Sequence, residues 1–245
     1  MSTKPLGRKN YGSIPHLPGS RMGPADKTCH EGQARIATAQ ARDRHDDVII
    51  QEKLDGSNVG VARIGDTLHS ITRAGWPAAS SPFEQHRLFA DWVYANYERF
   101  LAVLQDGERL VGEWMAQAHG TRYHLLHDPF VAFDLMVEDR RTPYDEFTAR
   151  LRPGEFVTPV ILHRGGPCSI DQALARLKTY GFHGALDTVE GAIWRVECNR
   201  LVDRRNGRRE RVVDFLVKYV RPDKVDGCYL PEITGGSTIW NWRPA

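Results

Sequence analysis

The sequence predicts an α+β fold in which mainly antiparallel strands are flanked by helices. Two pairs of strand-like segments are joined by Gly65-Asp66 and Asn206-Gly207, which are typical hairpin turns. Residues 81–104 and 169–181 carry apolar side chains at the spacing of an amphipathic helix. At 245 residues the chain fits one large domain or two small ones, and it can bury a sizeable core.

Alternating apolar residues predict most of the strands. The first 45 residues are expected to be loop-rich, because residues 5–32 contain four prolines and several glycines. After that segment we expect strands at residues 48–53, 59–64, 67–73, 109–115, 130–137 and 156–162. A long hairpin of residues 192–202 and 209–220 completes the sheets.

Three helices are expected outside the strands. A capping box at Ser81-Pro82-Phe83-Glu84 predicts a helix that continues to Leu104. A short helix is expected from Thr142 to about Leu151. Ser169 caps a third helix, which ends at Gly181.

Lys53 is the most informative residue, because it lies where one buried strand turns into the next. It begins the hexapeptide Lys53-Leu54-Asp55-Gly56-Ser57-Asn58. Lysine is a nucleophile only when neutral, and at its unperturbed pKa about one side chain in two thousand is neutral at pH 7. A catalytic lysine therefore needs a dry pocket or a neighbouring cation that lowers its pKa. We expect the end of the buried strand to supply the dry pocket.

The long hairpin carries two further candidates, Glu190 just before its first strand and Lys218 near the end of its second. Antiparallel pairing brings these two residues to the same end of the ladder. A site that binds both a phosphate and a metal requires such an arrangement of an acid and a base.

The hexapeptide resembles motif I of the covalent nucleotidyltransferases, the superfamily of polynucleotide ligases and mRNA capping enzymes. Further blocks follow in that family's order: residues 70–75 resemble the arginine-containing strand after motif I, 111–114 motif III, 131–135 motif IIIa, 190–194 motif IV and 215–221 motif V. The short blocks Phe133-Asp134 and Glu190-Gly191 and the ending at residues 220–224 are most similar to the RNA ligase 2-like branch of ATP-dependent RNA ligases.

The resemblance implies a ligase-type nucleotidyltransferase fold around a nucleotide pocket, and a reaction of three displacements at phosphorus. Lys53 attacks the α-phosphate of ATP and releases pyrophosphate. The AMP then passes to the 5′-phosphate end of an RNA, and a 3′-hydroxyl displaces AMP to seal the strand. Negative charge accumulates on phosphate oxygens throughout, so the site needs positioned cations.

The resemblance also implies the role of each site residue. The implied catalytic residues are Lys53, Arg73, Glu190 and Lys218. Glu190 is implied to hold Mg²⁺, or else Mn²⁺, directly or through water, and Lys218 to help lower the pKa of Lys53. The other nucleotide contacts implied are Phe133 stacked on the purine, Glu113 at a ribose hydroxyl, Glu52 at the adenine edge and Asn58 at the phosphates or the RNA end.

Motif V departs from the family pattern, which commonly has two lysines separated by one residue. Leu216 and Val220 stand at those spacings from Lys218. One cation is therefore missing, or Arg221 or Lys224 takes its place.

Residues 15–21 resemble an amino-terminal element that borders the nucleotide pocket in this branch. His16 and Arg21 in this element are candidate phosphate contacts. Without the resemblance, residues of these types in such a segment are more often ordinary loop residues than phosphate contacts.

The overall charge of +2 does not by itself indicate a nucleic-acid binder. Residues 200–211 contain six arginines, so they form either a solvated hairpin or a surface that follows an RNA backbone. His119, His124 and His127 are expected to make loop or RNA-end contacts more readily than to bind a metal.

The four cysteines are scattered, with no Cys-x-x-Cys pair, which argues against a zinc site or a disulfide framework. No secretory or membrane-spanning pattern is present, so we expect a cytoplasmic protein.

The sequence thus predicts a single nucleotidyltransferase domain over residues 1–245, with a short tail at 222–245 and no separate OB-fold domain. The leading hypothesis is an ATP-dependent RNA ligase in repair or processing, whose partners are RNA ends and possibly DNA ends. An accessory protein or self-association could then provide additional affinity for the RNA. The alternatives are an adenylyltransferase with another acceptor, and a nucleic-acid end-binding protein without catalysis.

Overall fold

The fold contains two antiparallel sheets, seen in a computed structural model that describes residues 3–203 and 205–244. The first sheet has the order β7-β1-β8-β9, formed by β7 (Ile161–Gly165), β1 (Asp47–Lys53), β8 (Gly191–Asp203) and β9 (Arg208–Val220). The second has the order β3-β2-β4-β5-β6, formed by β3 (Thr67–Thr72), β2 (Ser57–Ile64), β4 (Glu108–Trp114), β5 (Phe130–Val137) and β6 (Arg140–Arg141). The expected α+β class with antiparallel sheets is confirmed.

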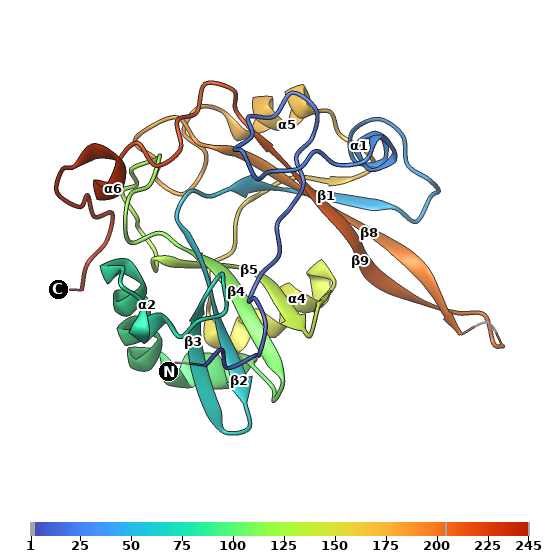
Figure 1. Cartoon of the computed structure of the whole chain (residues 1–245). Helices are drawn as coiled ribbons and strands as arrows, with labels where there is room; N and C mark the ends of the chain where they lie inside the picture. The colour runs from blue at the N-terminus through green and yellow to red at the C-terminus, as the bar shows by residue number, and fades with distance from the viewer. Residues whose placement is uncertain (1–2, 204, 245) are drawn as a thin grey trace.

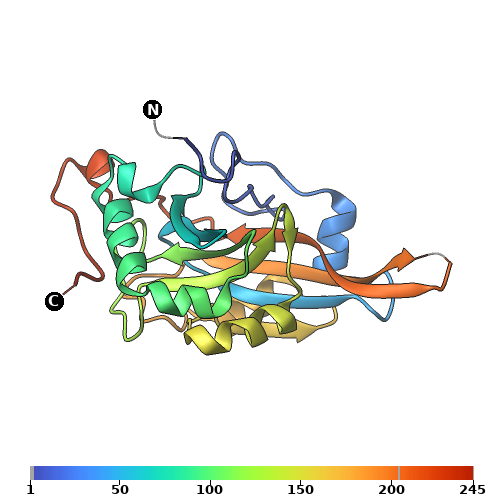
Figure 2. The same cartoon turned by 90° about the horizontal axis from the view of Figure 1, so that it is seen from below.

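Helices cover one face of each sheet (Figures 1 and 2). The first sheet packs against α1 (Glu31–Thr38) and α5 (Ile170–Leu177) in one apolar core. The second sheet packs against α2 (Glu84–Ala95), α3 (Tyr97–Val103) and α4 (Tyr144–Leu151) in another. Short 3-10 turns at Ala78–Ser80 and Arg152–Gly154 and the small helix α6 (Pro231–Thr234) complete the elements. The other faces of the two sheets are left to line the space between them.

Side chains alternate along β1, so one face of the strand packs in the apolar core and the other lines the space between the sheets. Val48 and Ile50 are fully buried in the core beneath α1 and α5. Gln51 and Lys53 lie on the opposite face, because successive strand side chains point to opposite sides. Lys53 is the last residue of β1 and thus sits at the edge of this polar face.

Several predicted elements are confirmed closely, above all the long hairpin. Its register pairs Gly191 with Val220 and Ile193 with Lys218. Figure 1 shows that β8 and β9 run on together as a two-stranded arm beyond the rest of their sheet. The hairpin of β2 and β3 at Gly65 and the capping box at Ser169 also form as predicted.

Other predictions about elements were wrong. The loop-rich amino-terminal segment contains α1, in which only Ala37 is buried, so the helix lacks the apolar stripe that would reveal it. The helix predicted to run to Leu104 is interrupted at Asn96, and it begins at Glu84. Ser81 does not cap it, because its hydroxyl lies 2.8 Å from Nδ1 of His86.

Two segments in the second half also differ from their predictions. The strand expected at residues 156–162 begins only at Ile161. The helix that follows Ser169 ends at Leu177, since Lys178 has a positive φ of 63°.

The carboxy-terminal tail folds back over the second sheet. The backbone N–H of Tyr229 donates to the carbonyl of His119, and that of Ala118 donates to the carbonyl of Ile239. Trp240 and Trp242 pack against the core beneath α2. Within the described residues, none of the helices combines the length and the apolar character needed to cross a membrane.

Candidate active site

A cavity of about 1010 Å³ opens between the two sheets. The eight residues to which the sequence assigns a site role all line it: Glu52, Lys53, Asn58, Arg73, Glu113, Phe133, Glu190 and Lys218. They come from both sheets and from the connections that follow β3 and precede β8. Residues far apart in the sequence thus meet around one space of the size of a small-molecule site.

Lys53 and Glu190 form the central pair of this cavity. Nζ of Lys53 lies 2.5 Å from Oε2 of Glu190. The contact follows from sheet register, since Lys53 pairs with Gly191 on the neighbouring strand. Glycine is required at 191, because a Cβ there would come within 1.9 Å of the carbonyl oxygen of Tyr219.

This pair changes the expected protonation of Lys53. Burial alone would lower its pKa, but the negative charges of Glu190 and Glu113 outweigh burial and raise it. The expectation that a dry pocket gives Lys53 a lowered pKa is therefore wrong for the structure as it stands. The negative charges of the two carboxylates thus keep Lys53 in its protonated form.

Burial raises the pKa of Glu190 and of Glu113 to about 7 each. In both cases the charge of Lys53 opposes this rise. Glu113 also accepts a hydrogen bond from the backbone N–H of Gly56 at 3.0 Å, which ties β4 to motif I. Two buried carboxylates beside one ammonium group leave the site short of positive charge, so a further cation would be stabilised here.

The remaining motif I residues hold the chain in place. Oδ2 of Asp55 accepts hydrogen bonds from the backbone of Gly120 and the hydroxyl of Thr121, both at 3.0 Å. A Cβ on Gly56 would lie 2.5 Å from the carbonyl oxygen of Trp114, so β4 passes too closely for any other residue. Asp55 and Gly56 thus position Lys53 and Asn58 on either side of the turn.

Lys218 and Arg73 are the other predicted cations. Burial and the charge of Lys53 lower the pKa of Lys218, although Asp26 lies 3.6 Å from its Nζ. Arg73 donates a hydrogen bond to the hydroxyl of Ser13 at 3.1 Å. Both side chains face the same cavity as Lys53, which is consistent with a phosphate between them.

Phe133 and Glu52 both line the cavity but have different partners, an aromatic ring for Phe133 and a backbone N–H for Glu52. Phe133 makes an edge contact with Tyr11, with ring centroids 5.3 Å apart, and Ile193 lines the same cavity from β8. The carboxylate of Glu52 instead accepts a hydrogen bond from the backbone N–H of Phe182 at 2.9 Å. Burial raises the pKa of Glu52 to about 7. Its predicted place at the adenine edge stays a prediction.

Arg221 and Lys224 do not supply the missing motif V cation. Arg221 donates to the carbonyl of Lys178 at 2.6 Å and does not line the cavity. Nζ of Lys224 is buried, and it donates to the carbonyls of Gly120 and Thr188 and to the hydroxyl of Thr121. Of the two alternatives left open by the sequence, these contacts favour a missing cation over its replacement by Arg221 or Lys224.

The histidines that follow motif III lie in different surroundings. Nε2 of His119, which lines the cavity, lies 3.1 Å from the amide oxygen of Gln85, while Nε2 of His127 lies 2.9 Å from Nδ1 of His183. Throughout the described residues, no group of three or more His, Cys, Asp or Glu side chains is arranged to hold a metal ion. A metal at Glu190 would therefore need ligands from phosphate and water, as Mg²⁺ commonly takes.

The basic hairpin is less positive than its sequence suggests. Arg200 pairs with Asp214, Arg208 with Glu210 and Arg211 with both Glu197 and Asp47. Arg204 lies outside the described residues. Arg205 and Arg209 are exposed on the arm.

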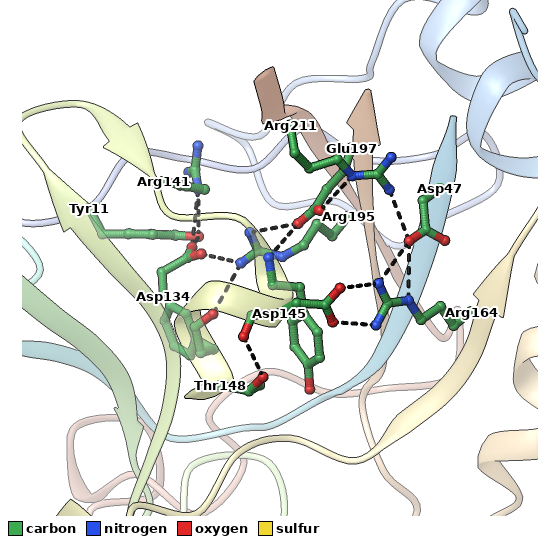
Figure 3. Close-up of polar contacts among 12 residues, drawn as sticks. Tyr11, Asp47, Asp134, Arg141, Asp145, Thr148, Arg164, Arg195, Glu197 and Arg211 are labelled. Atoms are coloured by element: carbon green, nitrogen blue, oxygen red, sulfur yellow. Dashed lines mark hydrogen bonds and ion pairs between the residues drawn. The ribbon is translucent and has the colours of Figure 1, made fainter. Parts of the chain in front are cut away.

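Sequence reasoning missed Arg195, which is 1% exposed and lines the cavity from β8. One of its Nη atoms donates to a carboxylate oxygen of Asp134 and to the carbonyl of Phe133. Figure 3 shows Asp134 also facing Tyr11 and Arg141. An arginine inside an otherwise apolar strand was the signal that could have revealed this contact.

Asp134→Ala is expected to lower the free energy of unfolding by about 3–5 kcal/mol, because it removes the anion to which the buried Arg195 is hydrogen-bonded and leaves it only the more distant Glu197 at 4.0 Å. Urea unfolding followed by tryptophan fluorescence measures the change. Asp139→Ala is the control, since that carboxylate is exposed and pairs only with Arg8 at the surface. Its effect is expected to be within about 0.5 kcal/mol. Equal effects of the two substitutions would show that the buried contacts do not stabilise the fold.

The chain matches the family model described as RNA ligase over residues 46–220, which is more than half of its length. No curated protein sequence matches it. Two solved structures of Naegleria gruberi RNA ligase variants have a similar fold. One, with ATP and Mn, has a TM-score of 0.53 and 15% identity, over 84% of this chain and 59% of that chain. The other, with AMP and Mn, has a TM-score of 0.52 and 14% identity, over 89% and 61%.

This likeness is one of fold, given the low sequence identity. The chain spans 50% of a further solved Naegleria chain, with pyrophosphate, and about six tenths of the two above.

Proposed function

The chain belongs to the RNA ligase family, and from that premise we propose that it is an ATP-dependent RNA ligase that joins 5′-phosphate and 3′-hydroxyl ends. One observation carries the proposal. The eight residues implied by the family motifs line a single cavity, with Lys53 paired to Glu190 within it. A surface that only binds nucleic acid has no need for a buried lysine between two carboxylates.

In the proposed first step, Nζ of Lys53 attacks the α-phosphorus of ATP, and pyrophosphate leaves. Lys218 and Arg73 bind the phosphate oxygens on which charge develops. Phe133 and Ile193 provide apolar faces for the base, and Glu113 accepts a ribose hydroxyl. The Naegleria structures with ATP or AMP support a nucleotide in this space.

A divalent cation fits the buried carboxylate of Glu190, with Mg²⁺ as the proposed ion and Mn²⁺ as an alternative. When bound there it would neutralise phosphate charge, and it would draw Glu190 away from Lys53. Release from Glu190 lowers the pKa of Lys53, so the neutral amine becomes available. The two Naegleria structures, which contain Mn, support a divalent ion.

In the later proposed steps, AMP moves from Lys53 to a 5′-phosphate, and a 3′-hydroxyl displaces it. Asn58 lies beside motif I, where it can contact the phosphates or the RNA end. The main alternative is an adenylyltransferase that delivers AMP to another acceptor, such as a DNA end. A catalytically inactive end-binding protein is disfavoured, because Lys53, Glu113, Glu190 and Lys218 are all present around one cavity.

Nucleotide choice tests the proposal against its relatives in the superfamily. The protein is incubated with Mg²⁺ and α-labelled ATP or GTP, and then run on a denaturing gel. We expect the label from ATP to stay with the protein and the label from GTP not to. Preferential labelling by GTP would indicate a capping-type enzyme, and the absence of label from either nucleotide would refute a covalent nucleotidyltransferase.

The two-stranded arm formed by the ends of β8 and β9 gives a separate prediction, about RNA affinity. Changing Arg205, Arg208 and Arg209 to Ser, together with Arg204, is expected to leave lysyl-AMP formation nearly intact, because the arm lies away from the cavity (Figure 1). RNA affinity should fall, and its salt dependence should flatten by up to about one unit of log slope per lost phosphate contact.

Filter binding at several salt concentrations, alongside a sealing assay, measures both effects. Sealing at the wild-type rate at moderate salt would show that the arm is only a solvated turn. The RNA surface would then be sought near Arg21, Arg122 and His124.

A further inference from the structure

Val220 is one of the two positions, with Leu216, that stand at the motif V spacing from Lys218, and another segment lies directly against it. Residues 15–21 run beside the end of β9. The backbone N–H of Leu17 donates to the carbonyl of Lys218 at 2.8 Å, and that of Arg21 donates to the carbonyl of Val220 at 3.0 Å. The N–H of Val220 in turn donates to the hydroxyl of Ser20 at 2.9 Å. These contacts fix Arg21 next to one of these two positions.

The Arg21 side chain lines the same cavity as Lys53, Glu190 and Lys218. One Nη atom lies 2.5 Å from Oδ2 of Asp226, which lines the cavity from the carboxy-terminal tail. The hydrogen bond and charge of Asp226, with a smaller contribution from the charge of Glu190, raise the pKa of Arg21. Arg21 is therefore within electrostatic reach of the central pair.

The other basic side chains nearby are held by different partners. Arg221 and Lys224 bind backbone carbonyls outside the cavity. Arg195 is bound to Asp134, beneath the expected position of the base. Arg21 differs from these three residues, because its partner lies largely in solvent. The side chain of Asp226 is 61% exposed, and that of Arg21 is 30% exposed. A weakly held, solvent-exposed pair exchanges partners at little cost.

We propose that Arg21 takes the place of the missing motif V lysine and binds phosphate oxygens at the mouth of the cavity. Its guanidinium group presents planar paired donors that match phosphate geometry, whereas a lysine presents a point charge. The carboxylate of Asp226 pairs with Arg21 until a phosphate binds to Arg21 in its place. The tail thus supplies a carboxylate that competes with the phosphate for one arginine.

This inference rests on the proposed function for its place in the reaction, but phosphate binding by Arg21 can be tested without it. The phosphate is either the leaving pyrophosphate of ATP or the 5′-phosphate of RNA, which share the same chemistry. Arg21 is a binding and positioning residue in both cases.

The direct test is calorimetric titration of the whole protein with inorganic pyrophosphate. Arg21→Gln is expected to weaken binding by about tenfold or more, as loss of a charge-assisted hydrogen bond does. Arg21→Lys should recover part of the affinity, and Asp226→Asn should bind pyrophosphate more tightly than wild type. The matched control is Arg8→Gln, which breaks the surface pair with Asp139 outside the cavity and should bind as wild type does. Equal affinities of Arg21→Gln and Arg8→Gln would overturn the proposal.

Kinetics then distinguish the two phosphates. A slower formation of lysyl-AMP from ATP, with unchanged sealing of pre-adenylylated RNA, assigns Arg21 to pyrophosphate. The reverse assigns it to the RNA 5′-phosphate, and unchanged rates in both reactions would contradict a place in the reaction. If the wild type forms no lysyl-AMP, the proposed function fails while the titration still decides whether Arg21 binds phosphate.

Discussion

Lys53→Ala is expected to retain no label after incubation with α-labelled ATP and Mg²⁺, whereas the wild type stays labelled through denaturing electrophoresis. In the proposed reaction the amine of Lys53 is the nucleophile, and among the described residues the other lysine that lines the cavity is Lys218, on β9. Loss of the bond-forming group removes the reaction itself, so the effect is the largest that we expect.

Lys27→Ala is the control for this experiment, since Lys27 is exposed and does not line the cavity. It should be labelled as the wild type is, and circular dichroism should show that both variants are folded. Labelling of Lys53→Ala at the wild-type level would remove Lys53 from its role.

Lys218→Ala is expected to slow lysyl-AMP formation by about a hundredfold or more, comparable to the loss of a preorganised donor to a developing oxyanion. The side chain projects from β9 into the cavity, at the end where Glu190 precedes the paired strand. Its charge is set beside the phosphate before the reaction, so no reorganisation is needed. Lys218→Arg retains the charge and is expected to recover part of the rate.

Single-turnover labelling at saturating ATP measures this rate for both variants. The fall should appear in the rate constant and not only in the ATP concentration needed for half saturation, because the contact strengthens as pyrophosphate leaves. A change confined to the half-saturating concentration would show that Lys218 only binds ATP.

The places of Lys53, Glu190 and Lys218 at strand ends could be predicted from the sequence because they depend on short-range signals. Asn206-Gly207 sets the hairpin, and antiparallel pairing then brings Glu190 and Lys218 to one end of it. The apolar run before Lys53 places it at the end of a buried strand. Each step needs only local pattern and the geometry of a single sheet.

The features that escaped prediction depend on contacts between distant segments. The sequence named Arg21 as a candidate phosphate contact but did not place it beside motif V, because residues 15–21 reach β9 through contacts two hundred positions apart. Arg195 meets Asp134 because β8 and β5 face one another from different sheets. The protonation of Lys53 likewise depends on how many carboxylates surround it. The cap predicted at Ser81 failed for a local reason, because the Ser81 hydroxyl contacts His86 five residues later.

The most direct test of the account follows the AMP from the protein to RNA. Protein labelled with α-labelled ATP is freed of nucleotide and mixed with Mg²⁺ and a nicked RNA that carries a 5′-phosphate and a 3′-hydroxyl. We predict that the label leaves the protein, that an adenylylated RNA appears transiently, and that sealed RNA accumulates in step with released AMP. Label that remains on the protein, or that leaves it while the nick stays open and no adenylylated RNA forms, would contradict an RNA ligase.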